Sequence, residues 1–181
     1  TESLGQTWYE GNTMYAAIGQ ENTRSTPVQL ANYIATLANG GKHYPVHLLK
    51  TVKTNDFSQV VEEYEPEPLD TIDISQENLA AVLEGMREVA SGDGTAAKYF
   101  ADLGVTVGAK TGSAQVSSDS ETNAVFVCFA PFENPEVAIA IVAEKGGSGA
   151  ELGAVAADIL SYYFSAEETI ESIDAENTLL R

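Results

Sequence analysis

The tripeptide Lys110-Thr111-Gly112, followed by Ser113, combines the residue types with the clearest chemical use in this chain. It lies within a β-branched, glycine-punctuated run at 105–116, which predicts an extended strand. On a strand, the lysine supplies a positive charge, the threonine hydroxyl can donate to a carboxylate, and the glycine lets a ligand backbone approach closely. The backbone N–H of Ser113 could donate to a developing oxyanion. This set suits acyl transfer on a peptide that ends in a carboxylate.

The tripeptide by itself is a weak signal, because an exposed lysine on a strand is also a common guard against aggregation. In serine acyltransferases a Lys-Thr-Gly strand is one of three motifs, and the others are Ser-x-x-Lys and Ser-x-Asn or an equivalent. Neither of these two motifs occurs anywhere in the sequence. The chain therefore carries one part of such a site without the lysine-activated serine.

Three strands are predicted around the tripeptide, at 105–116, 123–130 and 136–144. The two joints between them are short, which forces antiparallel neighbours because parallel strands need long crossover connections. A helix at about 150–164 follows the glycine-rich stretch 146–149. The sequence thus predicts an antiparallel sheet, covered by helices, in an α/β fold of the α+β type.

The preceding half of the chain is predicted to supply the covering helices. Thr26 can cap a helix in which Pro27 occupies the first turn, and Gly40-Gly41 stops it. Ser75 caps a second helix that reaches residue 90, and a short helix is expected at 95–103. The buried stripe predicted for the second helix is Leu79, Val82, Leu83, Met86, Val89 and Ala90. A β-hairpin is predicted at 46–64, whereas 1–24 is predicted to be irregular because Gly5, Gly11 and Gly19 interrupt any period.

Composition excludes several classes of function. The formal net charge is −18 over 181 residues, which repels phosphate backbones and argues against a nucleic-acid partner. No apolar run approaches the roughly 18 residues of a membrane span, and the first residues lack the pattern of a signal peptide. The one cysteine, Cys128, lies in the apolar run 124–130. It is predicted to be a buried small hydrophobe, and a single cysteine rules out an intrachain disulfide.

Taken in order, several segments closely resemble the transpeptidase domain of class B, elongation-type penicillin-binding proteins. The most specific are the helix opened by Thr26-Pro27-Val28-Gln29 and the strand with Lys110-Thr111-Gly112-Ser113. The resemblance covers about residues 5–165 and corresponds to the C-terminal half of that domain. The segments that carry it are 17–20, 26–41, 85–89, 94–96, 108–115, 123–131 and 144–147.

The resemblance implies part of a peptidoglycan DD-transpeptidase that cross-links stem peptides by serine acyl transfer and binds β-lactams. By position, Lys110 and Ser113 match catalytic residues, and Lys110, Thr111, Gly112, Ser113 and Gln115 match the substrate-binding set, with the loop 117–122 along the cleft. No metal or cofactor is implied. The nucleophile, its lysine partner and the second-motif serine would precede this chain, which is therefore expected to be a fragment that is inactive alone.

The same resemblance sets expectations for partners and location. The partners would be the D-Ala-D-Ala stem peptide, β-lactams and the missing N-terminal half of the domain, with self-association of the fragment also possible. The parent protein would lie at the extracytoplasmic face of the cell membrane. Residues 1–165 would belong to the transpeptidase domain, and 166–181 would form an acidic, frayed tail.

Two rival functions share the tripeptide. A serine β-lactamase has the same fold, although the long 46–64 hairpin favours the penicillin-binding protein. A non-catalytic β-lactam sensor or wall-binding module would keep Lys110-Thr111-Gly112 for ligand capture alone. Hydrolysis of a β-lactam rather than stable acylation would identify the β-lactamase.

Other polar and aromatic residues are better explained by structure than by a site. His43 and His47 are four apart, but Gly41 and Pro45 forbid the helix that would pair them on a metal. Trp8 and Tyr9 are expected in the core or at its rim. The remaining expectations are a solvated strand face at 62–65, a turn at Asp93 and no phosphate site at Ser148.

Overall fold

The computed structural model describes residues 7–20, 24–115 and 121–177. In chain order its elements are α1 (Glu10–Ala17), α2 (Pro27–Ala38), β1 (Lys42–His43), β2 (Thr51–Lys53), β3 (Val60–Glu63), β4 (Asp70–Thr71), α3 (Gln76–Val89), α4 (Ala97–Phe100), β5 (Gly108–Ala114), β6 (Asn123–Ala130), β7 (Val137–Ala143), the 3₁₀ helix η2 (Gly149–Glu151) and α5 (Leu152–Asn177). No helix within the described ranges has the length and apolar character needed to cross a membrane.

The central sheet has the order β5-β6-β7, and both pairs are antiparallel. The prediction of three antiparallel strands in this part of the chain is confirmed, and so is the α/β fold class. The first strand is shorter than predicted, because pairing with β6 begins at Gly108 and ends at Ala114. Short joints impose this order: the turn between β6 and β7 leaves no room for a crossover helix.

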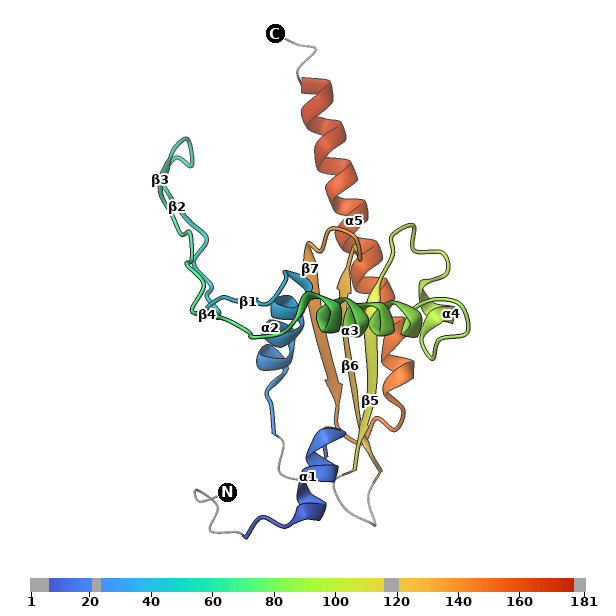
Figure 1. Cartoon of the computed structure of the whole chain (residues 1–181). Helices are drawn as coiled ribbons and strands as arrows, with labels where there is room; N and C mark the ends of the chain where they lie inside the picture. The colour runs from blue at the N-terminus through green and yellow to red at the C-terminus, as the bar shows by residue number, and fades with distance from the viewer. Residues whose placement is uncertain (1–6, 21–23, 116–120, 178–181) are drawn as a thin grey trace.

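Helices cover both faces of the sheet, as Figure 1 shows. On one face α2 and α3 pack against Val127 and Phe129 through Ile34, Leu37 and Met86. On the other face α4 and α5 pack against Phe126 and Cys128, chiefly through the buried residues Phe100, Ala156 and Leu160. Residues alternate between the two cores along β6, which is why its apolar run is almost continuous.

Local sequence signals explain where the covering helices begin. The Thr26 hydroxyl accepts a hydrogen bond from Gln29 N–H at 3.3 Å, and Thr26 N–H donates to Gln29 Oε1 at 2.8 Å. This reciprocal capping box, with Pro27 in the first turn, confirms the predicted start of α2. Ser75 Oγ similarly accepts from Asn78 N–H at 3.2 Å and caps α3. The predicted short helix at 95–103 is reduced to the four residues of α4.

Cys128 is fully buried, and burial raises the pKa of its thiol to about 12. Desolvation disfavours the thiolate, which is the reactive form of cysteine. The predicted role as a small core hydrophobe is confirmed.

The predicted hairpin is present as β2 and β3, which project as an arm away from the sheet (Figure 1). Its turn is closed by Asp56, whose carboxylate accepts from the Thr54 hydroxyl at 2.5 Å and from Ser58 N–H at 3.2 Å. These bonds lower the pKa of Asp56 to about 2. All residues of β3 are exposed, which confirms a solvated strand face at Glu62 and Glu63.

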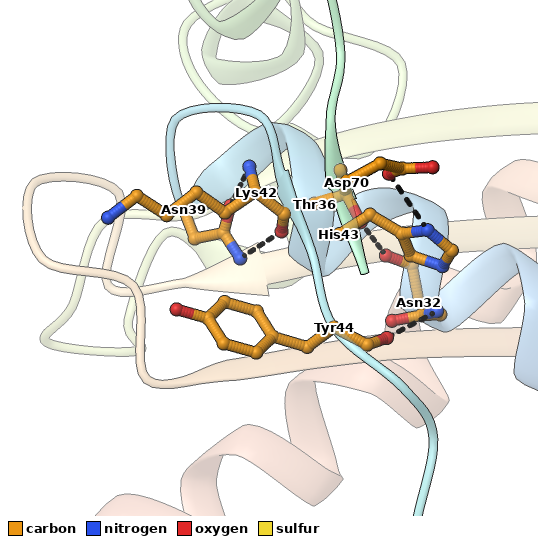
Figure 2. A network of polar contacts seen from close by, with 7 residues as sticks. All are labelled: Asn32, Thr36, Asn39, Lys42, His43, Tyr44 and Asp70. Atoms are coloured by element: carbon orange, nitrogen blue, oxygen red, sulfur yellow. Dashed lines mark hydrogen bonds and ion pairs between the residues drawn. The ribbon is translucent and has the colours of Figure 1, made fainter. Parts of the chain in front are cut away.

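A network that the sequence did not predict fixes the root of this arm (Figure 2). Asn39 and Lys42 exchange hydrogen bonds of 2.8 and 3.0 Å, and Asn32 Nδ2 donates to Tyr44 O at 3.2 Å. His43 Nδ1 lies 3.2 Å from Asp70 Oδ1, across the short β1–β4 pair. Polar contacts therefore attach the arm to α2 and to its C-cap residue Asn39.

Three expectations for the two ends of the chain are wrong. Residues 10–17 form α1 rather than an irregular segment, because Gly11 lies in its first turn and Gly19, at φ +79°, follows its C-cap. Helix α5 does not end near 164 but continues through Asn177, since no glycine or proline follows Gly153. Trp8 and Tyr9 are exposed and lie outside the core. The division of the chain at residue 165 stays a prediction.

Candidate active-site cleft

The tripeptide lies on β5, which pairs only with β6 in the described part of the chain and leaves its other edge open. Lys110 is opposite Val127, and Val127 belongs to the core beneath α2 and α3. Thr111 is opposite Phe126, and Phe126 belongs to the core beneath α4 and α5. Directly opposed residues share a face of the sheet, so Lys110 and Thr111 belong to opposite faces. A ligand that contacts both must therefore lie along the open edge of β5.

A cleft of about 490 Å³ lies over the face of the sheet that carries Lys110, between α2, α3, β5 and β6. Lys110, Thr111 and Gly112 line it on the strand side, with Val125 and Val127 from β6. The cleft explains a departure from the predicted buried stripe of α3: Val82 is 43% exposed because it lines the cleft instead of the core. The Lys110 side chain is exposed, and its Nζ donates to Thr111 O at 2.6 Å.

The strand is held in place from behind by η2. A Cβ at Gly149 would lie 2.1 Å from Gly112 O and 2.4 Å from Val125 O, so only glycine fits there. Gly149 N–H donates to Ser113 Oγ at 3.3 Å. A hydroxyl can accept and donate at once, so Ser113 keeps its own proton for a ligand. Ser148 caps η2, because its Oγ accepts from Ala150 N–H at 3.3 Å.

Two threonine hydroxyls meet at the open edge of β5. Thr95 Oγ1 lies 3.4 Å from Thr111 Oγ1, although the two residues are sixteen positions apart. Thr95 was not among the predicted site residues, and neither was Gly149. For Thr95 the sequence signals are its place after the break at 91–94 and within the resemblance segment 94–96. Gly149 is marked only as the end of the glycine-rich stretch 146–149.

The structure describes the positions of some of the predicted site residues but not of others. Lys110, Thr111, Gly112 and Ser113 are brought together by the strand itself, and Gln20 Nε2 reaches Ser113 O at 3.5 Å. Gln115 is exposed just beyond the end of β5. Residues 117–120 of the loop expected along the cleft lie outside the described residues. The ligand-binding roles of these residues stay predictions.

The two histidines lie away from the cleft, at the arm. His47 Nδ1 is 2.9 Å from Leu49 O, and its ring packs on Tyr64 with centroids 4.4 Å apart. The nearest charged partner of His43 is Asp70. Within the described ranges, no group of three or more His, Cys, Asp or Glu side chains is arranged to hold a metal ion.

The sequence of this chain is similar to a known protein family. Residues 1–161 match the family model described as "Penicillin binding protein transpeptidase domain". The chain is 34% identical to "Peptidoglycan D,D-transpeptidase MrdA" of Escherichia coli strain K12, over 94% of this chain and 29% of that protein. The chain thus spans less than a third of the length of this curated relative.

Solved structures agree with the sequence comparison. The crystal structure of Pseudomonas aeruginosa PBP2 in complex with WCK 5153 is similar, with a TM-score of 0.71 and 35% identity over 89% of this chain and 35% of that one. Penicillin-binding protein 2B of Streptococcus pneumoniae strain R6 gives a TM-score of 0.75 at 26% identity, over 88% of this chain and 28% of that one.

Proposed function

Because the chain belongs to the family of penicillin-binding protein transpeptidase domains, we propose that it forms one wall of the active site of a peptidoglycan D,D-transpeptidase. The observation that carries this proposal is the Lys110-Thr111-Gly112 strand, which has an open outer edge and lines a cleft beneath α2 and α3. The names of the relatives support the same activity for the longer protein that they represent.

In the proposed reaction, a serine outside this chain attacks the carbonyl carbon of the D-Ala-D-Ala peptide bond. An ester C–O bond forms and the amide C–N bond breaks, and the terminal D-alanine leaves with the proton that the serine gave up through its lysine partner. An amine from another strand then attacks the ester, forms the cross-linking amide and returns the proton to the serine. β-Lactams acylate the same serine.

The residues of this chain bind and orient the substrate. The Thr111 and Ser113 hydroxyls donate to the terminal carboxylate of the stem peptide, and Lys110 adds positive charge beside the serine and the carboxylate. The Ser113 N–H donates to the oxyanion that forms on the attacked carbonyl. Gly112 leaves room for the peptide backbone, and Gln115 lies further along the same path. The partners proposed for the parent protein are the stem peptide and β-lactams, at the extracytoplasmic face of the membrane.

The first test uses a fluorescent penicillin and a denaturing gel. The chain alone should give no labelled band, because it contains no Ser-x-x-Lys to acylate. The longer protein, with its serine-bearing segment, should give a band that persists after excess label is removed. A band at the mass of the isolated chain would contradict the first expectation. Rapid loss of the band from the longer protein, with hydrolysed penicillin in solution, would point to a β-lactamase instead.

The second test concerns association of the isolated chain. Strand β7 pairs with β6 along one edge and, among the described residues, with no strand along the other. It is rich in β-branched residues, and an open apolar edge is a template for strand addition. We expect the isolated chain to form dimers or larger species whose population rises with concentration in light scattering. The like charge of −18 opposes this association, so it should strengthen when salt is added.

A lysine introduced on this edge should suppress the association. Val142 is 39% exposed on β7, so Val142→Lys adds charge to the edge without burying it. Val155→Lys is a matched control on helix α5, where the replaced side chain is 46% exposed. Equal association of both variants and the unsubstituted chain would show that β7 is not the contact.

A further inference from the structure

The contact between Thr95 and Thr111 goes beyond the residues assigned to the proposed site. It joins the α3–α4 connection to the open edge of β5, and the two Oγ1 atoms are 3.4 Å apart. Thr111 is the residue whose hydroxyl would donate to a substrate carboxylate. The partner of that hydroxyl therefore affects how it meets a ligand.

The backbone holds Thr95 firmly in this place. A Cβ at Gly94 would lie 2.0 Å from Glu88 O, so the chain passes the end of α3 more closely than any side chain allows. Ala96 N–H donates to Val89 O at 3.0 Å, and the Ala96 side chain is fully buried. Thr95 is thus fixed between a position that admits only glycine and a buried alanine, while its own side chain stays exposed at the strand edge.

The number of hydroxyl hydrogens decides which threonine must donate to the other if Thr111 is also to donate to a ligand. Each threonine hydroxyl has one hydrogen to donate and two lone pairs that accept, whereas an ionised carboxylate can only accept. If Thr111 donates to Thr95, it has no proton for the carboxylate. If Thr95 donates to Thr111, the Thr111 proton points to the ligand, and a chain of aligned hydrogen bonds strengthens each of its members.

We propose that Thr95 is a positioning residue for carboxylate recognition: its hydroxyl donates to Thr111 and thereby directs the Thr111 proton to the carboxylate of the stem peptide or β-lactam. The inference rests on the proposed function, since it needs a carboxylate ligand at β5. Thr95 acts through Thr111 and does not touch the ligand.

The test measures second-order acylation rate constants in the longer protein that includes the serine-bearing segment. The probes are benzylpenicillin and its neutral methyl ester, which lacks the anionic carboxylate. Thr95→Val keeps the shape and removes the donor, and it should lower the rate constant for benzylpenicillin about fivefold, the effect of one hydrogen bond. The rate constant for the ester should change by less than about twofold, and Thr95→Ser should restore the rate for benzylpenicillin.

A double-mutant cycle separates action through Thr111 from direct contact. In a Thr111→Val background, Thr95→Val should have no further effect on the benzylpenicillin rate constant, because the relayed proton is already gone. A further loss of similar size in that background would overturn the inference in favour of direct contact by Thr95. A loss that is equal for the acid and the ester would overturn it in favour of a purely structural role.

Failure of this inference is distinguishable from failure of the proposed function. Normal acylation of the unsubstituted protein, with Thr95→Val unchanged for both probes, would remove Thr95 alone from carboxylate recognition. Absence of acylation in the unsubstituted protein would overturn the proposed function together with this inference. Melting temperatures of the variants confirm that all are folded, and Thr95→Ala, which also removes the donor, provides a second variant should Thr95→Val not fold.

Discussion

Replacement of Lys110 by alanine should lower the second-order rate constant for β-lactam acylation on the order of 100- to 1000-fold in the longer, serine-bearing protein. The expected loss is large because a preorganised positive charge beside the reacting atoms stabilises charge that develops in the transition state. The free energy of unfolding of the Lys110→Ala variant should hardly differ from that of the unsubstituted protein. The Lys110 side chain is exposed at the cleft, so its truncation leaves no buried cavity and no buried partner unpaired.

The measurement pairs stopped-flow or gel-based acylation kinetics with melting temperatures. Lys53→Ala is a matched control, because it removes the same charge from the exposed β2 strand of the arm, away from the cleft (Figure 1). That variant should acylate at the normal rate. If Lys110→Ala acylates as fast as the unsubstituted protein, Lys110 has no part in the mechanism. If its melting temperature falls sharply as well, the lysine is structural.

Replacement of Gly149 by alanine should cause a large loss of stability. The new Cβ would lie 2.1 Å from Gly112 O and 2.4 Å from Val125 O, and these are backbone atoms that cannot rotate away. Overpacking costs roughly 1–3 kcal/mol, and a clash with two fixed backbone atoms belongs at the upper end, about 3 kcal/mol. For a domain of this size, that corresponds to a fall in melting temperature of roughly 6–12 °C. Because η2 would be pushed off β5, acylation of the longer protein should fall as well.

Gly85→Ala provides the control for this substitution. Gly85 lies within α3, and a Cβ there would meet nothing within 4 Å. Alanine in a helix interior is more favourable than glycine by roughly 0.5–1 kcal/mol, so the melting temperature should rise slightly. Thermal unfolding followed by circular dichroism compares the two. A Gly149→Ala protein as stable as the unsubstituted chain would mean that η2 does not pack tightly on the strand.

The sequence by itself determined the features that depend on neighbouring residues. Thr26, Pro27 and Ser75 mark the starts of α2 and α3 because a helix cap is a contact between residues three apart. The antiparallel order of β5, β6 and β7 follows from joints too short for a crossover. Lys110, Thr111 and Gly112 reach the cleft together because they are covalently consecutive. The ends of helices were harder to predict from the sequence. Near α1, for example, Gly11 and Gly19 lie at the ends of the helix rather than interrupting it.

Only the tertiary structure decided which distant segments meet at that strand. Thr95 faces Thr111 across sixteen positions, and Gly149 contacts Gly112 across thirty-seven, because packing on the sheet brings them together. No local periodicity encodes such contacts, since they depend on how α3, α4 and η2 fill the space beside β5. The same reason explains why Val82 is exposed, although its place in an apolar stripe predicted that it would be buried. Whether a stripe residue is covered depends on its neighbours in space, and beside Val82 the structure has a cleft.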